Sequence, residues 1–342
     1  MKPRSVLTVI VALALGGCGV TLSPSPGGAA LDRIATSVAR RAAVPRPDRR
    51  KSWISPELAH AQAPLLFVSD SGTADVYIYN LSALKLVGTL TGFEQPQGEC
   101  SDNKGNVWVT DTSAKTIYEL SHRGHLENEL KDSSGYPVAC AWDPTTRNLA
   151  VMNLFGTGSN AGAVLVYPPG SSGPSVYTNS AQYYYNFGGY DGNGNLFFDG
   201  RNASGNFMLS ELPKGENSAH TVSVTGGTIY FPGMVQWNVP KKTLIVGDQS
   251  CGNEYVSCLY TLAIGKNGGT IESETSLQNY TGGQVCDLVQ GILYGSKIAG
   301  SDFDFCGSDL SATYVWSYPT GGKPNLDNNR ADSVPVGAAI SK

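Results

Sequence analysis

The chain has 342 residues, of which only 15% are charged, and its formal net charge is −4. This length allows one large domain or two ordinary ones. From residue 64 onward there are 15 basic and 25 acidic side chains, a net charge of −10. Because no basic stripe is present to neutralise phosphates, we expect no nucleic-acid partner. The 41 glycines and the many short apolar runs favour an all-β domain.

Residues 1–17 have the pattern of an export signal. Lys2 and Arg4 precede an apolar run over residues 6–15, which is too short to span a bilayer. The following Leu15-Gly16-Gly17-Cys18 resembles the bacterial lipobox, which implies a lipoprotein signal peptide over 1–17 and lipidation of Cys18. Several acyl chains would anchor the protein stably in the membrane. The alternative is an ordinary secretory signal with an incidental cysteine.

Residues 18–63 are predicted to form a flexible, lipid-anchored tether. Prolines and glycines interrupt regular structure here, and seven basic against three acidic residues give the tether a net charge of +4. The tether either lies on anionic headgroups or is solvated. Since Gly19 rather than aspartate follows Cys18, the signal for inner-membrane retention is absent, and we expect the protein at the outer membrane or the cell surface of the bacterial envelope.

A sequence pattern recurs at intervals of about 40–50 residues, which is typical of a propeller or solenoid. It consists of a Pro-x-Gly run, a Gly-Asn turn, and an apolar strand that ends in aspartate. The pattern is clearest over residues 96–111 and returns over 137–153 and 189–199. Each repeat predicts two inner strands followed by two more variable outer ones.

The two ends of the domain are predicted to share one sheet. Residues 65–70 already read as a second strand, whereas residues 334–341 carry the Pro-x-Gly signature with no second strand after them. The last strand would therefore close the first sheet and remove its exposed edge. Residues 64–342 then divide into six four-stranded blades of about 46 residues each, which predicts an all-β, six-bladed β-propeller.

The repeat resembles the NHL-type six-bladed propeller repeat, best over Pro96 to Asp111 and only weakly in the last two units. The resemblance implies the fold over residues 64–342. Signalling, scaffolding and enzymatic propellers share this repeat, so it does not imply an activity.

Six cysteines remain after Cys18, and an even number in an exported domain favours disulfides. Fifteen pairings are possible. We expect Cys251–Cys258 within a short loop, Cys100–Cys140 between neighbouring repeats, and Cys286–Cys306 from the remainder. A zinc site is the alternative, but no C-x-x-C spacing supports it.

Polar residues end the predicted second strands on one face of the domain. These pore-face candidates are Asp70, Asp111, Asn153, Asp199 and Asp248. They could converge on a cation or a polar ligand, or each could bond to its own following turn. Asp302 and Asp304 are further cation candidates, placed in an acidic loop that interrupts the last unit. The run from Asp191 to Asn195 resembles the opening of a calcium loop, but a tight turn is the better interpretation.

Glu99 is the candidate for individual chemistry because it does not recur in the other repeats. Gluconolactonase-type propellers hold a divalent metal with a glutamate on an inner strand, and Glu99 lies on a first strand. The Glu-Gly-Pro-x-Trp signature of that family is absent. Tryptophans such as Trp142 and Trp237 could form a stacking platform for sugars or peptides, or wedge between blades.

We therefore expect a non-enzymatic binding module in the cell envelope. We expect the lipid on Cys18 to anchor it to the membrane. Its ligand is an unidentified protein or a polar small molecule. No cofactor is required, although a divalent cation such as Ca²⁺ could bind. The alternative is a metal-dependent hydrolase or lactonase at the axial pore, with Glu99 and the second-strand aspartates as ligands.

Overall fold

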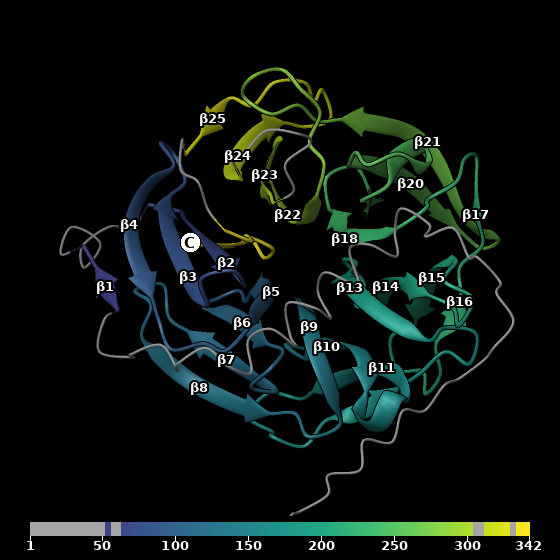
Figure 1. The fold of residues 1–342 in the computed structure, drawn as a ribbon. Helices are drawn as coiled ribbons and strands as arrows, with labels where there is room; N and C mark the ends of the chain where they lie inside the picture. Colours follow the sequence, from purple (N-terminus) through teal and green to yellow (C-terminus); the bar gives the residue numbers. More distant parts are fainter. Residues whose placement is uncertain (1–51, 56–62, 304–310, 329–332) are drawn as a thin grey trace, which may run out of the picture.

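The computed structural model describes residues 52–55, 63–303, 311–328 and 333–342. In this part of the chain, six β-sheets stand around a central axis, and the first strand of each sheet lies innermost (Figure 1). The protein is thus the six-bladed β-propeller that the repeats predicted.

The first blade joins the two ends of the domain. Its C-terminal strand pairs antiparallel with the first strand after the N-terminal segment, with Leu65 opposite Ser341, so the predicted ring closure is confirmed (Figure 1). A short strand from the segment expected to be a tether adds a fifth, outer member to the sheet. The strands of this blade are, from outside to inside, β1 (Trp53–Ile54), β4 (Lys85–Leu90), β3 (Asp75–Asn80), β2 (Leu65–Asp70) and β26 (Ala339–Ser341).

The other blades follow in chain order. The second blade contains β5 (Pro96–Ser101), β6 (Val107–Asp111), β7 (Thr116–Leu120) and β8 (Leu126–Lys131). The third contains β9 (Gly135–Trp142), β10 (Leu149–Gly156), β11 (Ala161–Tyr167) and β12 (Ser175–Tyr177). The fourth contains β13 (Tyr184–Tyr190), β14 (Leu196–Arg201), β15 (Phe207–Leu212) and β16 (His220–Thr221).

The fifth blade has an additional outer strand, which runs parallel to its neighbour. Its strands are β18 (Pro232–Asn238), β19 (Thr243–Asp248), β20 (Cys258–Gly265), β21 (Gly268–Ser276) and the added β17 (Val224–Thr225). The sixth contains β22 (Leu288–Tyr294), β23 (Lys297–Asp302), β24 (Ala312–Ser317) and β25 (Leu326–Asp327).

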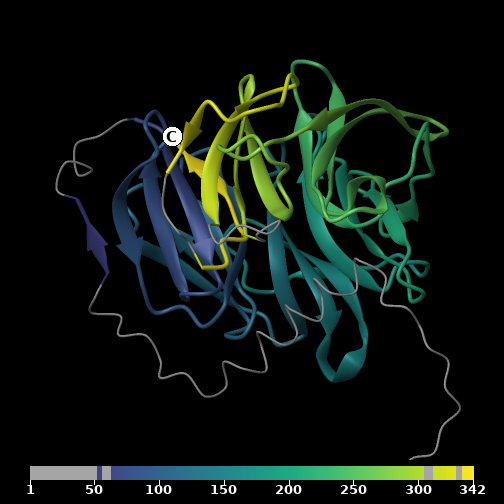
Figure 2. The same ribbon diagram turned by 45° about the horizontal axis from the view of Figure 1, so that its top comes forward.

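Two 3-10 helices interrupt the loops, η3 (Thr157–Ser159) between β10 and β11 and η4 (Cys251–Asn253) after β19. The β10–β11 hairpin extends beyond the neighbouring blades on one face of the disc (Figure 2). Within the described ranges, no helix has the length and apolar character needed to cross a membrane.

The core lies between facing sheets rather than in one central mass. The second strands β2 and β19 are buried along their whole length, because a neighbouring blade covers each face. One apolar cluster joins the first two blades through residues such as Phe67 and Val109. Each fully buried side chain of this kind contributes about 1.5–3 kcal/mol.

The turns between first and second strands depend on aspartate and glycine. The Oδ1 atom of Asp191 accepts N–H groups from Asn193 and Asn195 at 2.8 Å each, and Gly194 adopts φ +90°. Only glycine takes that backbone conformation without strain. The run that resembled a calcium loop is therefore a tight turn.

Two predicted disulfides are confirmed. Cys100–Cys140 joins the innermost strands of the second and third blades, and Cys251–Cys258 links η4 to the start of β20. The third predicted pair includes Cys306, which lies outside the described residues.

Candidate functional site

The aspartates that end second strands bind backbone N–H groups. Asp111 accepts hydrogen bonds from the amides of Glu94 at 2.7 Å and Gln95 at 2.8 Å, just before the first strand of its own blade. It also accepts one from Ala114 in its following turn at 3.3 Å. Burial raises the pKa of the Asp111 carboxyl above its ordinary value, and these hydrogen bonds act against that rise. The carboxyl thus fastens the first strand to the second.

The same arrangement recurs in three other blades. Asp248 accepts the amides of Tyr230 and Phe231, each at 2.9 Å. Asp70 accepts those of Ser333 and Val334 and so helps to close the ring. Asp302 was expected in a loop, but it ends β23 and accepts the amides just before β22, those of Cys286 and Asp287. Asp304 lies outside the described residues.

Asn153 and Asp199 are placed differently, inside strands that continue past them. The Nδ2 group of Asn153 donates to the hydroxyl of Ser134 at 3.3 Å. The Oδ1 atom of Asp199 accepts the amide of Phe187 at 2.8 Å, while Oδ2 has no partner in the described chain. Burial holds the pKa of Asp199 well above its ordinary value. None of the described pore-face candidates lines the axial cavity.

The axial cavity has a volume of about 310 Å³ and is lined mainly by the first strands of the second to sixth blades. Its wall contains the half-buried aromatic side chains of Trp142, Tyr190 and Trp237. Gln236 contributes an amide, whose Oε1 atom accepts the N–H of Leu293 at 2.6 Å. Aromatic faces with a few directed polar groups are typical of small-molecule sites.

Two side-chain donors at this wall have no acceptor within the described residues. The indole N–H of Trp142 is buried and makes no hydrogen bond. The Nε2 group of Gln236 likewise has no protein partner, since only its oxygen is engaged. The Trp142 N–H is covered by protein atoms, so a ligand in the cavity would meet the indole ring rather than this group. The Gln236 Nε2 group is the donor that a ligand oxygen could reach.

Gln290 lines the cavity, and its side-chain amide links its own blade to two others. Its Nε2 group donates to the carbonyl oxygen of Glu99, and its Oε1 atom accepts the N–H of Glu99, both at 2.8 Å. The same oxygen accepts the N–H of Ala338 at 3.1 Å. The inner edge of a first strand has no neighbouring strand to satisfy its backbone groups. The Gln290 amide satisfies those groups for β5 and for the segment before β26.

The Glu99 carboxyl is buried behind this wall, and the residue is only 1% exposed. Neither carboxyl oxygen has a hydrogen-bond partner in the described chain. The Ser69 hydroxyl and the Ala339 N–H lie near enough to favour ionisation, although neither forms a hydrogen bond of normal geometry. Desolvation outweighs them and holds the pKa of Glu99 well above its ordinary value. Burial therefore favours the protonated form of this carboxyl and keeps both of its oxygens from solvent.

These residues do not fit the divalent metal that a gluconolactonase-type site requires. Such an ion needs several oxygen ligands converging on it. Among the described residues, Glu99 belongs to no group of three or more histidine, cysteine or acidic side chains, and backbone N–H groups occupy Asp70, Asp111 and Asp248. We derive no metal-dependent step at the axis.

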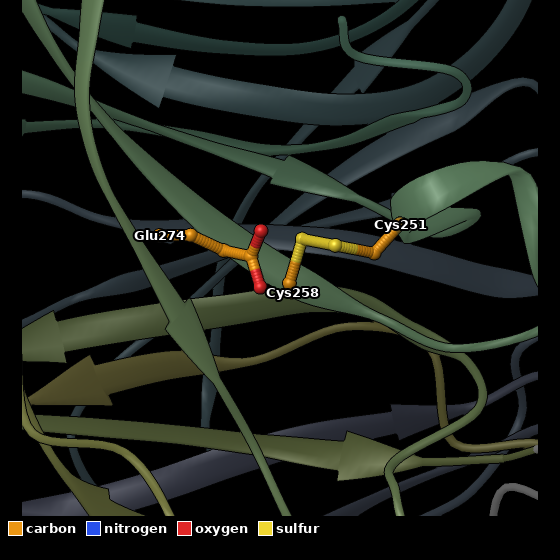
Figure 3. A group of neighbouring side chains, drawn as sticks. All are labelled: Cys251, Cys258 and Glu274. Atoms are coloured by element: carbon orange, nitrogen blue, oxygen red, sulfur yellow. A yellow bond between two sulfur atoms is a disulfide. The ribbon is translucent and has the colours of Figure 1, made fainter. Parts of the chain in front are cut away.

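The described residues contain one cluster with metal-ligand side chains, Cys251, Cys258 and Glu274 (Figure 3). The two sulfur atoms are bonded to each other. Zinc binds thiolates, which a disulfide cannot provide. This cluster is a covalent link with a neighbouring carboxylate rather than a metal centre.

The contribution of Gln236 and Gln290 could not be foreseen from the sequence, which also leaves two roles open for Trp142 and Trp237. The pattern of a first strand identifies these residues as inner-strand members. It does not say which side chains face the axis, because a register shift interrupts pairing in most of the inner strands.

The chain matches no protein-family model and no curated protein. Among solved structures, it is similar to a protein of unknown function from Bacteroides caccae, with a TM-score of 0.61 and 12% identity over 82% of this chain and 100% of that one. It is also similar to Kuenenia stuttgartiensis hydrazine synthase, with a TM-score of 0.51 and 15% identity over 71% of this chain and 69% of that one. At these identities the similarity shows the fold alone.

Proposed function

We propose that this protein is a cell-envelope lipoprotein whose propeller is a binding module for a small, neutral, oxygen-rich molecule. The observation that carries the proposal is the axial cavity, whose wall combines the aromatic side chains of Trp142, Tyr190 and Trp237 with the Gln236 amide, of which only the oxygen has a protein partner. A hydroxyl or carbonyl oxygen of a sugar-like ligand would accept a hydrogen bond from the Gln236 Nε2 group. The indole faces of Trp142 and Trp237 would cover its apolar side.

The size and charge of the cavity support a neutral ligand. A volume of about 310 Å³ lies at the small end of ligand sites. The Glu99 oxygens are covered, and burial raises the pKa of this carboxyl, so Glu99 contributes little charge to the wall. Asp102 also lines the cavity, but its Oδ1 atom accepts the backbone N–H groups of Lys104 and Asn106. A rigid disc with this site at its axis, anchored through Cys18, would present the site at the envelope. The Pro96 to Asp111 repeat supports an NHL-type module. Such a module could also bind a protein partner.

Tryptophan fluorescence tests the ligand proposal. Neutral monosaccharides should change the emission of the full chain in a saturable way, and Trp237→Ala should weaken their binding by about tenfold or more. Trp53→Phe is the matched control because Trp53 is exposed on the outer strand β1. Binding that survives Trp237→Ala unchanged would contradict an axial site.

The hydrolase alternative makes a different prediction. It requires stoichiometric calcium or zinc in the purified protein and loss of that metal in Glu99→Ala. Our proposal predicts that elemental analysis gives the same substoichiometric metal content for wild type and variant. Metal lost specifically with Glu99 would favour the hydrolase.

The anchor has its own test. Cys18→Ser should move the protein from the membrane fraction to the soluble fraction, because the thiol is the atom that takes the lipid. A variant that stays in the membrane fraction would refute lipidation at Cys18.

A further inference from the structure

A second feature of the molecule is an arginine that is buried without a counter-charge. Arg201 ends β14 and is 6% exposed. Within the described part of the chain its guanidinium forms no ion pair, and its Nε–H group has no hydrogen-bond partner. Its Cζ atom lies 4.9 Å from the ring centroids of both Tyr184 and Phe231. The two rings stabilise the cation but offer no acceptor in the plane of the guanidinium.

The neighbouring glycine makes this position possible. A Cβ atom at Gly200 would lie 1.8 Å from the carbonyl oxygen of Tyr184, so any larger residue would separate the two strands. Glycine at position 200 lets β14 approach Tyr184 closely, and the ring of Tyr184 then covers the guanidinium of Arg201.

Arg201 lines a groove of about 660 Å³ where the fourth blade meets the segment that enters the fifth. No acidic residue lines this groove, although the domain carries a net charge of −10. Tyr230, which is 40% exposed, borders the same groove. The other polar lining residues have hydroxyl or amide groups and include Ser204, Asn206, Thr221, Ser223, Thr228 and Asn253.

The charge of Arg201 cannot be relieved from within. Burial lowers the pKa of its guanidinium to about 10, which still leaves it charged at neutral pH. A charged group removed from water is costly unless it is paired and hydrogen-bonded. The described protein supplies no anion, so an anionic ligand in the groove would meet a charge that has no protein counter-ion.

We propose that this groove binds the carboxylate of an acidic sugar. The planar guanidinium suits a carboxylate, which it can hold through two parallel hydrogen bonds. The hydroxyl and amide groups would bond to the sugar hydroxyls, and the exposed face of Tyr230 would cover the ring. The groove is separate from the axial cavity, so this proposal does not depend on the proposed function.

Calorimetric titration of the full chain tests this assignment. Glucuronate and galacturonate should bind at least about tenfold more tightly than glucose and galactose, because only the acids pair with Arg201. Arg201→Gln should lower uronate affinity about tenfold or more, and Arg201→Lys should lower it less. The exposed Arg123→Gln is the control and should bind uronates as wild type does. Equal affinity of the wild type for acids and neutral sugars, or full uronate affinity in Arg201→Gln, would overturn the proposal.

A surface variant keeps the proposal testable if Arg201→Gln does not fold. Tyr230→Ala should weaken uronate binding several-fold and leave acetate binding unchanged, since acetate needs only the guanidinium. Acetate that binds the wild type as tightly as the uronates would contradict the assignment to a sugar, as would undiminished uronate binding in Tyr230→Ala.

Discussion

Glu99 and Arg201 are both ionisable groups buried without a counter-charge, yet burial affects them in opposite ways. Burial raises the pKa of the Glu99 carboxyl behind the axial cavity and so favours its protonated, neutral form. Arg201 cannot release its proton at neutral pH, because even the lowered pKa of its guanidinium is about 10. An acid can thus neutralise itself in a core, whereas an arginine needs a partner.

This difference separates a structural group from a binding group. Glu99 does not recur among the repeats, which made it the candidate for chemistry, but the structure encloses it between strands. Arg201 belongs to no motif recognised in the sequence, but it lines a groove that has no acidic residues. The second site is therefore recognised by a buried charge that has no protein counter-ion. That a residue such as Glu99 does not recur among the repeats is a weaker sign.

Disulfide removal should have the largest effect, because each disulfide restricts the unfolded chain. One disulfide lies beside each site. Cys100 and Cys140 line the axial cavity and are 40 residues apart, whereas Cys251–Cys258 spans 7 residues beside the groove. Replacing the first pair by serine should lower the free energy of unfolding by about 4 kcal/mol, and replacing the second by about 2.5 kcal/mol. Chemical denaturation measures both values. A larger loss from the shorter loop would contradict this order.

Glu99→Gln should raise the free energy of unfolding at neutral pH. The folded wild type keeps the proton above the ordinary pKa of 4.5, where the unfolded chain releases it. Wild-type stability therefore falls as pH rises, by about 1.4 kcal/mol per pH unit until the folded-state pKa is reached. The advantage of Glu99→Gln should vanish below pH 4.5. Denaturation at pH 4, 5.5 and 7 measures it, and a constant difference would show that Glu99 is ionised.

Arg201→Met should have a smaller effect that does not depend on pH. Removing an unpaired buried charge should raise the free energy of unfolding by about 1–2 kcal/mol in the absence of ligand. Since arginine is charged throughout pH 5–8, the gain should be constant over that range. A loss of stability would mean that contacts with Tyr184 and Phe231 outweigh desolvation.

The blade count and the ring closure could be predicted because Pro, Gly and Asp recur at fixed places, as in Pro96 to Asp111 and Pro335 to Ser341. The bond from a terminal aspartate to its own following turn, as between Asp111 and Ala114, also follows from sequence position. The bonds of Asp111 to Glu94 and Gln95 were not predicted. Strand β1 was missed because Trp53 and Ile54 are too short a run to show alternation. Arg201 could not be recognised, since Tyr184 and Phe231 come from other strands and loops. Gln290 was missed for the same reason: its partner is 191 residues away.

The protonation state of Glu99 tests the account of the axial site most directly. Carbon-13 NMR of glutamate-labelled protein, assigned with Glu99→Gln, would follow this carboxyl from pH 4 to 8 with and without calcium. We predict a resonance that stays at the protonated position at pH 7 and does not move when calcium is added. An ionised Glu99 at pH 7, or a shift on adding calcium, would contradict a neutral binding site and favour a metal centre.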